Sequence, residues 1–175
     1  MERRAVFFDR DGVLNHVVFR EGRAVSPRTM AQLIVVDGAP AAMLRLKCAG
    51  LHVFGVTNQP DVARGFVTAA LADDMTRTVA LAARLDDYRI CPHDDPDDCG
   101  CRKPRPGMIT GLAEAWSISL DRSFVVGDSD RDVGAGRAAG CTTVLLRRPY
   151  NERVHADIVV DSVAEAAVAI LERAQ

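Results

Sequence analysis

The amino-acid sequence predicts an α/β fold, a doubly wound parallel sheet with helices on both faces. Short apolar segments such as Ala5–Phe8 contain no alternating polar residues, which is typical of strands buried on both faces. These segments alternate with stretches of helical periodicity. Polar clusters follow four of the strands, beginning at Asp9, Thr57, Cys91 and Asp128. Because ligands bind at the carboxyl ends of strands in open parallel sheets, we expect these clusters to meet at one edge.

Size and composition limit the classes of protein to consider. The chain of 175 residues is 48% hydrophobic and 26% charged, so we expect one globular domain, residues 1–175. A net charge of −2 and a pI near 6.1 argue against a nucleic-acid partner. No apolar run approaches the ~20 residues that cross a membrane, and no secretory leader is recognisable. We therefore expect a cytoplasmic monomer that binds neither nucleic acid nor membrane.

The first elements are a strand, an irregular segment and a helix. Ala5–Phe8 ends at Asp9, and Asp11 and Gly12 follow on a turning loop. The segment 16–37 has no clean period. It is either a substrate loop over the carboxyl end of the sheet or a plain solvated connection. The helix that follows ends before Gly50 and has apolar residues at helical spacing: Ala39, Ala42, Met43 and Leu46.

The middle of the chain is predicted to add two strands and a helix. The strands are Leu51–Val56, which leads into Thr57, and a short one near Tyr88–Ile90. Between them, a helix from Thr68, a good N-cap residue, to Leu85 presents one apolar face. The residues of that face are Leu71, Met75, Val79 and Ala82.

The last part of the chain continues the alternation. A helix carries an apolar stripe that includes the only tryptophan: Met108, Ile109, Leu112, Ala113 and Trp116. Strands are predicted at Ser123–Val126, Thr142–Leu146 and Ile158–Val160, with an Ala-rich helix closing at Gly140. Ser162 and Glu165 form a capping box that starts the final helix.

Three cysteines and a histidine lie within eleven positions and predict a structural zinc site. The proposed ligands are Cys91, His93, Cys99 and Cys101, in a loop spanning residues 91–103. Thiolates and imidazole are the donors that tetrahedral zinc prefers, and four protein ligands leave no position for a reacting water. Disulfides or free thiols are the alternatives, and the expected reducing compartment disfavours disulfides. Cys48 and Cys141 are expected to be small buried residues.

A second cluster combines carboxylates with a lysine. Asp9, Asp11 and Asp128 offer hard oxygen ligands, which suit Mg²⁺ bound together with a substrate phosphate. Lys103 follows the last proposed zinc ligand, with Arg102 beside it. The lysine either balances the charge of these acids or clamps a phosphate dianion.

These motifs together resemble a known family. Asp-x-Asp-Gly, then Thr-Asn after a strand, then Arg-Lys-Pro, then Gly-Asp-x-x-x-Asp, is an order similar to that of the haloacid dehalogenase superfamily of phosphotransferases. The Cys-x-His and Cys-x-Cys pairs of the zinc loop resemble the branch of heptose bisphosphate and histidinol-phosphate phosphatases. The resemblance runs from Phe7 to about Gly140. Without a large insertion, the chain looks like a capless member with a Rossmann-like sheet, in which loops and the zinc module replace a cap domain.

The resemblance implies a role for each matching residue. Asp9 would be the nucleophile that forms an aspartyl-phosphate, and Asp11 the general acid and base. Asp9, Asp128 and the backbone carbonyl of Asp11 would hold Mg²⁺. Thr57 and Lys103 would bind phosphate oxygens, and Asp132 would orient Asp128 or Lys103. Three further side chains would face the substrate: Asn58, Gln59 and Arg102.

The sequence favours a heptose bisphosphate as the substrate and keeps histidinol phosphate as the alternative. Seven arginines, at 10, 20, 23, 28, 64, 102 and 105, suit a heptose bisphosphate, which carries a second phosphate. The short zinc loop, with aspartates at 94, 95, 97 and 98, favours histidinol phosphate, because acids suit a cationic amine. If those acids form only a solvated loop, this second argument fails. An alternative of another class is a non-catalytic phosphate-binding or interaction module, which would not need a nucleophile.

Overall fold

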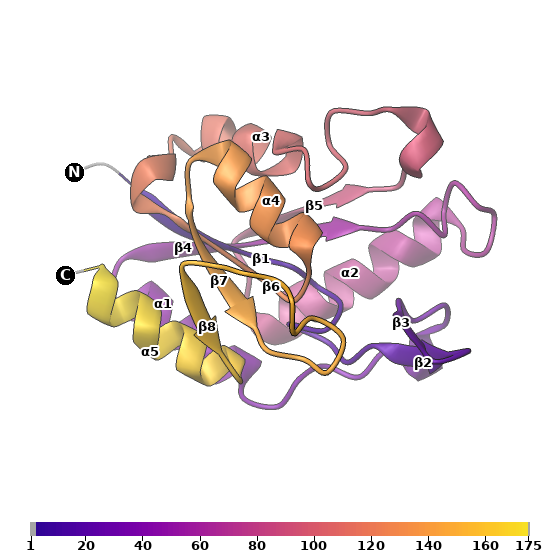
Figure 1. Ribbon diagram of the computed structural model, residues 1–175, viewed down its shortest axis with the longest axis horizontal. Coiled ribbons are helices and arrows are strands. Elements are labelled where there is room, and N and C mark those ends of the chain that lie inside the picture. The colour runs from indigo at the N-terminus through magenta and orange to yellow at the C-terminus, as the bar shows by residue number, and fades with distance from the viewer. Residues whose placement is uncertain (1–2, 175) are drawn as a thin grey trace.

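The computed structural model describes residues 3–174 and is built on a six-stranded parallel sheet (Figure 1). The strands stand in the order β5-β4-β1-β6-β7-β8. Their bounds are Arg4–Phe8 for β1, Leu51–Asn58 for β4, Asp87–Cys91 for β5, Phe124–Gly127 for β6, Thr142–Leu146 for β7 and Ile158–Val160 for β8. The predicted strands are therefore all present, although β4 runs two residues further than expected.

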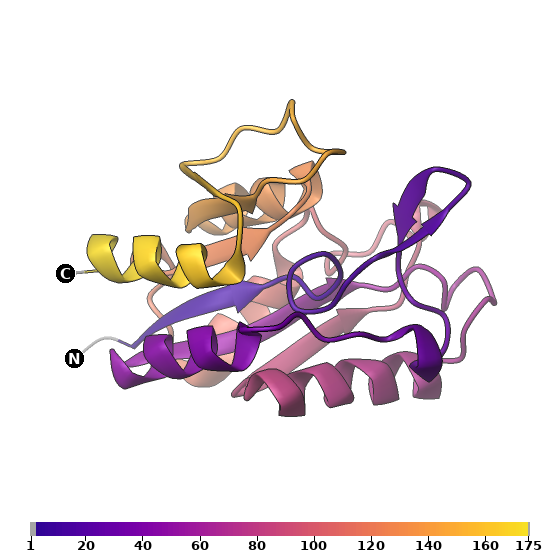
Figure 2. The ribbon, with the colours of Figure 1, turned by 90° about the horizontal axis from the view of Figure 1, so that it is seen from below.

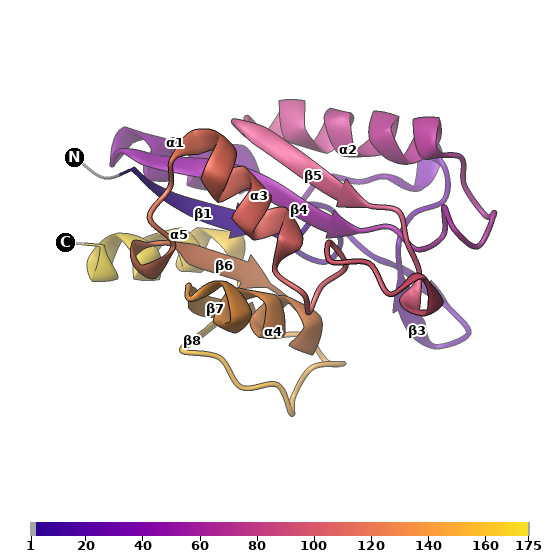
Figure 3. The ribbon, with the colours of Figure 1, turned by 90° about the horizontal axis from the view of Figure 1, so that it is seen from above.

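Helices cover both faces of the sheet, which confirms the predicted doubly wound α/β fold. They are α1 (Ala39–Cys48), α2 (Ala69–Ala83), α3 (Gly107–Trp116), α4 (Asp130–Ala139) and α5 (Val163–Arg173). Helices α1, α2 and α5 lie on one face (Figure 2), and α3 and α4 lie on the other (Figure 3). No helix in residues 3–174 is long and apolar enough to cross a membrane.

The central strand β1 shows why its sequence has no polar alternation. Val6 and Phe8 belong to the core cluster beneath α1 and α5, whereas Ala5 and Phe7 belong to the cluster beneath α3 and α4. All four side chains are fully buried. Both faces of the strand are thus in contact with apolar layers, as expected of a central strand in a parallel sheet.

The strand order places a switch point beside β1. The chain proceeds from β1 to β4 and β5 on one side, then returns to β6 on the other. Asp9 follows β1 directly, and its N–H donates to the carbonyl of Val126 in β6 at 2.9 Å. Asp128 follows β6. The two carboxylates therefore flank the crevice where doubly wound sheets bind ligands.

The irregular segment 16–37 forms a small hairpin beyond the carboxyl end of the sheet (Figure 1). Strands β2 (Val18–Arg20) and β3 (Arg23–Val25) pair antiparallel. A bridge between Asn15 and Val35 closes the base of this excursion. Several of its residues line the cavity described below, so the substrate-loop interpretation is favoured over a plain connection.

Local packing differs from the sequence prediction at several positions. On α2, Ala82 is exposed and Leu71 only half-buried, because the buried face is rotated to include Thr76. Cys48 is exposed rather than buried, since it ends α1 on the solvent side, whereas Cys141 is buried as expected.

Helix ends and edges differ in smaller ways. Glu165 does not complete a capping box with Ser162; its carboxylate accepts from the N–H of Asp161 at 3.0 Å. Trp116 is partly buried, and its indole packs 5.3 Å from the Phe54 ring. Its Nε1 donates to Asp87 at 3.2 Å, so one end of the ring pairs with a carboxylate at the edge of the core.

Leu112→Ala should destabilise the fold by about 2–5 kcal/mol, because Leu112 is fully buried between α3 and the sheet and its loss leaves a cavity. Leu81→Ala is the matched control, since Leu81 is 74% exposed on α2 and should change stability by less than about 0.5 kcal/mol. Urea unfolding followed by circular dichroism measures both. Equal losses in the two variants would contradict the assignment of the core.

Candidate active site

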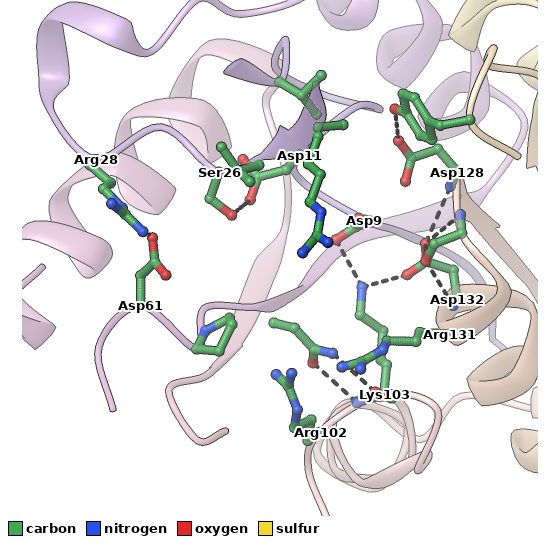
Figure 4. Close-up of a pocket in the computed structure, with 18 of the residues that line it drawn as sticks. Asp9, Asp11, Ser26, Arg28, Asp61, Arg102, Lys103, Asp128, Arg131 and Asp132 are labelled. Atoms are coloured by element: carbon green, nitrogen blue, oxygen red, sulfur yellow. Dashed lines mark hydrogen bonds and ion pairs between the residues drawn. The ribbon is translucent and has the colours of Figure 1, made fainter. Parts of the chain in front are cut away.

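The polar clusters that follow the strands meet around one cavity of about 550 Å³ at the carboxyl end of the sheet (Figure 4). Its walls come from the β1 loop, the β2–β3 hairpin, the segment after β4, the zinc loop and the start of α4. Among the residues given a role from the sequence, those that line it are Asp9, Asp11, Asn58, Arg102, Lys103, Asp128 and Asp132. The predicted convergence of these clusters is therefore what the structure shows.

Lys103 lies at the centre of the site and has three acceptors. Its ammonium group donates to Asp9 Oδ1 at 2.8 Å, to Asp132 Oδ1 at 2.6 Å and to the backbone carbonyl of Val56 at 2.8 Å. Burial by itself lowers the pKa of Lys103, but the carboxylates of Asp132 and Asp9 outweigh it and raise the pKa above its ordinary value. The side chain is thus a fixed positive charge beside Asp9.

Asp9, Asp128 and Asp132 form a cluster of hard oxygen donors that can surround a cation. One ligand atom from each lies within 4.8 Å of the others. Burial raises the pKa of Asp9 well above its ordinary value, with the neighbouring Asp132 adding to it, and burial together with Asp132 raises the pKa of Asp128 to about 6. The three carboxylates, when ionised, carry three negative charges, and Lys103 balances only one of them. The remaining negative charge and the oxygen donors fit a divalent cation such as Mg²⁺.

Asp132 has the partners of a positioning group. Its Oδ1 accepts from Lys103, while its Oδ2 accepts from the backbone N–H groups of Asp128 and Ser129, at 3.2 and 3.1 Å, and from Ser129 Oγ. These contacts tie Asp128 to the first turn of α4. Gly127 makes room for this arrangement, because a Cβ there would lie 2.1 Å from the Cβ of Asp132.

Asp11 is held by a dense set of donors. Its carboxylate accepts from Arg10, from Asn15 Nδ2 at 2.9 Å, from Ser26 Oγ at 2.8 Å and from Gln59 Nε2 at 2.7 Å. Burial alone raises its pKa, but the Arg10 guanidinium and these hydrogen bonds reverse the effect and lower the pKa below its usual value. These contacts therefore favour the ionised form of Asp11.

Gln59 corrects one sequence prediction. It was expected to face the substrate, but only 1% of it is exposed, and its amide nitrogen donates to Asp11 and to Thr57 Oγ1. The reason is that the backbone N–H of Gln59 bonds to the carbonyl of Cys91 and continues the β4–β5 pairing, which turns the side chain inward.

Thr57 is buried as well and does not line the cavity. Asn58 lines it and also exchanges two hydrogen bonds with the backbone of Lys103, at 3.0 and 3.1 Å.

The zinc-loop side chains come together as predicted. The sulfur and Nδ1 atoms of Cys91, His93, Cys99 and Cys101 lie 3.2–3.6 Å apart in the five closest pairs. Donors of this kind around a tetrahedral zinc, at bond lengths of 2.0–2.3 Å, are separated by roughly 3.5–3.8 Å. The cluster therefore has the donors and nearly the spacing of a zinc site. No cysteine in the described residues forms a disulfide.

The acidic residues of the zinc loop are mostly exposed, as expected of a solvated loop, but they are not a free site for an amine. Asp94 pairs with Arg64 at 2.6 Å, and Asp95 pairs with Arg102 at 2.7 Å and with Arg131 at 3.1 Å. The guanidinium of Arg102, and then that of Arg131, lower the pKa of Asp95 to about 2. Asp97 accepts from the backbone of Asp94 at 2.7 Å, and Asp98 pairs with Arg105. All four aspartates thus have partners within the protein.

The arginines divide into rim and structural residues. Four of the seven named from the sequence line the cavity: Arg23, Arg28, Arg64 and Arg102. Arg10 does not; it is 1% exposed, and it bonds to Asp11 and to Thr76 Oγ1 at 2.8 Å, so it supports the nucleophile loop instead. Arg20 and Arg105 bond to Gln32 and Asp98, away from the cavity.

Arg131 and Tyr150 are among the cavity-lining residues that sequence reasoning missed. Arg131 lies inside the Gly-Asp-x-x-x-Asp motif, at a position that the motif leaves unspecified. Tyr150 follows β7, so the rule that functional residues follow strand ends could have found it. The residues after β7 contain no recognised motif.

Comparisons with known proteins agree with this geometry. A family model described as HAD-hydrolase-like matches residues 100–166. A D-glycero-beta-D-manno-heptose-1,7-bisphosphate 7-phosphatase of Rhodopseudomonas palustris is 40% identical over 150 residues, covering 79% of this chain and 80% of the relative. The enzyme of the same name from Pseudomonas aeruginosa is 32% identical and covers 98% and 100%. The crystal structure of the D,D-heptose 1,7-bisphosphate phosphatase of B. bronchiseptica, complexed with magnesium and phosphate, superposes with a TM-score of 0.81 at 28% identity, covering 98% and 99%.

The fold and the site together define a phosphoric monoester hydrolase on a doubly wound sheet. The chain belongs to the haloacid dehalogenase-like phosphatases, in the family of the relatives just described. The sequence predicted a member of this superfamily and an enzyme, and both predictions are confirmed. The alternative of a non-catalytic module is not supported.

Cys99→Ser should remove zinc and lower kcat/KM by about a hundredfold, because the loop that carries Arg102 and Lys103 loses its anchor. The helical circular dichroism signal should persist, since most of the core beneath α3 and α4 comes from strands and helices outside the loop. Metal analysis is expected to find one zinc per wild-type chain. Cys48→Ser is the matched control, because Cys48 is exposed and outside the cluster. Wild-type protein without zinc after chelator-free purification, or normal kinetics of Cys99→Ser, would contradict the zinc module.

Proposed function

We propose that this chain is a Mg²⁺-dependent phosphatase that hydrolyses D-glycero-D-manno-heptose 1,7-bisphosphate through an aspartyl-phosphate on Asp9. The observation that carries the proposal is the contact of Lys103 with one oxygen of Asp9 inside a cavity with a basic rim. The names of the relatives support the heptose substrate and the 7-phosphate as the group removed.

Asp9 has one oxygen held and one available. Lys103 occupies Oδ1, and no hydrogen bond reaches Oδ2 from any residue in the described part of the chain. In the first step Oδ2 attacks phosphorus, the bond between phosphorus and the sugar oxygen breaks, and the aspartyl-phosphate forms. Lys103 is the proposed partner of the phosphate oxygens, whose charge must be neutralised. Thr57 was expected to share this role, but it is buried and does not line the cavity.

Asp11 is the proposed proton carrier for both steps. It gives a proton to the departing sugar alkoxide, then takes one from the water that attacks phosphorus, and the bond to Asp9 breaks to release inorganic phosphate. Its hydrogen bonds favour the ionised form before substrate binds. The like charge of a phosphate dianion in the cavity would act against this preference and raise the pKa of Asp11, which favours the protonated form needed for donation.

A Mg²⁺ ion at this site would neutralise phosphate charge during transfer. The proposed ligands are Asp9, Asp128 and the backbone carbonyl of Asp11. Two features of the chain keep these groups in place. Asp132 ties Asp128 to α4. Gly12 allows the β1 loop to approach Asp128, because a Cβ at this position would lie 1.9 Å from Asp128 Oδ2. We expect activity to be lost without Mg²⁺.

The rim of the cavity favours a substrate with a second phosphate. Arg23 is exposed on the hairpin and has no charged partner among the described residues. Arg131, whose side chain is 41% exposed, lines the cavity from the start of α4. Asp95 binds Arg102 and Arg131 through one carboxylate, which holds two guanidiniums side by side with a net positive charge. Guanidinium groups bind phosphate through paired donors. Asn58 and Arg102 complete the proposed substrate contacts.

Histidinol phosphate loses its main support. That alternative required the aspartates of the zinc loop to receive a cationic amine, but Asp94 and Asp95 are already paired with arginines. The short loop therefore presents positive charge to the cavity rather than negative charge. This rim, like the names of the relatives, favours a heptose bisphosphate.

Three further expectations complete the proposal. The Cys and His cluster would hold structural Zn²⁺, since its thiolates are soft ligands and would not compete for Mg²⁺. The cytoplasm is the proposed compartment, because a zinc thiolate site needs reduced cysteines. A monomer without a nucleic-acid or membrane partner remains our expectation, in keeping with the net charge of −2.

Asp9→Asn should abolish turnover, because an amide cannot displace the sugar oxygen from phosphorus. Less than a few per cent of the wild-type rate is expected in a phosphate-release assay, with an unchanged circular dichroism spectrum. Asp74→Asn is the control, since Asp74 is exposed on α2 and pairs only with the neighbouring Arg77. Substantial turnover by the Asp9 variant, with contaminating phosphatases excluded, would rule out the nucleophile assignment.

Arg131→Gln should raise KM for the heptose bisphosphate about tenfold, because one charge-assisted contact to the second phosphate is lost. It should leave the KM for heptose 7-phosphate nearly unchanged. Arg137→Gln, in the last turn of the same helix, is the matched control. The wild-type enzyme should show its highest kcat/KM for the bisphosphate in a panel that includes histidinol phosphate. A preference for histidinol phosphate would overturn the substrate and leave the phosphatase chemistry standing.

A further inference from the structure

The loop after β7 connects the two strand ends that carry the active-site carboxylates. Arg148 donates to the carbonyl of Gly12 at 2.8 Å, and Asn151 Nδ2 donates to the carbonyl of Asp128 at 2.8 Å. Asn151 also bonds to the carbonyl of Leu146 at 2.8 Å, so the loop is fixed to the end of its own strand. Between these anchors, the hydroxyl of Tyr150 donates to Asp128 Oδ2.

The environment of Asp128 makes its two oxygens unequal. Oδ2 lies against Gly12, where an added Cβ would stand 1.9 Å from it, and that position is only 3.0 Å from the Tyr150 hydroxyl. Oδ2 is therefore enclosed by the β1 loop and the tyrosine. No residue in the range 3–174 donates a hydrogen bond to Oδ1. Figure 4 shows Asp128 directed toward the cavity on the same side as Asp132.

We infer that Tyr150 is a positioning residue that restricts Asp128 to one metal-binding oxygen and thereby selects Mg²⁺ over Ca²⁺. The inference rests on the proposed cation site, of which Asp128 is a ligand. Mg²⁺ requires six nearly octahedral ligands at about 2.0–2.1 Å, which single carboxylate oxygens and waters supply. Ca²⁺ takes about 6–8 oxygens at longer distances and readily uses both oxygens of a carboxylate. Because Asp128 Oδ2 accepts the hydrogen bond of Tyr150, Asp128 cannot bind Ca²⁺ through both of its oxygens.

The arrangement of the loop supports a selective role rather than a purely structural one. Arg148 and Asn151 already fix the loop through backbone carbonyls, so the Tyr150 hydroxyl is not needed to hold it. The residue is 43% exposed, and its ring adds little to the core. Tyr150 also lines the substrate cavity, so its one hydrogen bond acts at the metal-binding carboxylate itself.

The test is Tyr150→Phe, which removes the hydroxyl and keeps the ring. Isothermal titration calorimetry with MgCl₂ and CaCl₂ separately, on zinc-loaded protein without substrate, gives the Kd for each ion. We expect the ratio of the Ca²⁺ Kd to the Mg²⁺ Kd to fall about tenfold, since one added oxygen contact favours only Ca²⁺. Tyr88→Phe is the matched control, because the Tyr88 hydroxyl also donates to a carboxylate, Asp73, at 2.9 Å, but away from the cavity.

A second measurement covers the working enzyme. In hydrolysis of an aryl phosphate at fixed Mg²⁺, Ca²⁺ should inhibit Tyr150→Phe at about tenfold lower concentration than the wild type or Tyr88→Phe. An unchanged Ca²⁺ to Mg²⁺ ratio in the folded variant, or Mg²⁺ binding that survives Asp128→Asn, would overturn the inference. A shifted ratio in a protein that does not hydrolyse the heptose bisphosphate would support the inference and reject only the proposed substrate.

Discussion

The buried ammonium group of Lys103 is the interaction on which the rest of the site depends. A charge removed from water is stable only when it is paired and hydrogen-bonded, and its three acceptors come from β4, the β1 loop and α4. Lys103 itself comes from the zinc loop. One side chain thus joins four segments that are distant in sequence, and each of them contributes a group to the proposed reaction. Removing Lys103 would leave Asp9 and Asp132 as neighbouring unpaired carboxylates.

The zinc loop carries Lys103 to this position without an apolar core of its own. Its cysteines and histidine form one anchor, and its aspartates form another by pairing with Arg64, Arg102 and Arg131. Such exposed ion pairs contribute little stability, but they set the direction of each guanidinium. The hairpin of residues 18–25 faces this loop across the cavity. Two short excursions therefore form opposite walls of the cavity.

The order of motifs was sufficient to predict the superfamily, the convergence of Asp9, Asp11, Asp128 and Lys103, and the clustering of the zinc-loop residues. Each of these follows a strand or sits at a fixed spacing, so parallel pairing brings them to one edge. The partners of charged side chains were not predictable in this way. Arg10 and Gln59 turned out to support Asp11 from within, and the acidic loop turned out to bind arginines.

The sequence by itself determined the class of fold and the chemical types at the site, because periodicity and strand-end position depend only on residues close in the chain. Only the tertiary structure decided which charged side chains are paired within the protein and which remain available to a ligand. Asp95 meets Arg131 across 36 positions, and Tyr150 meets Asp128 across 22. Such pairings depend on the path of loops whose conformation is set by packing rather than by local pattern. For this reason the carboxylate of Asp95 holds Arg102 and Arg131 at the rim of the cavity. One oxygen of Asp128 already accepts a hydrogen bond from Tyr150.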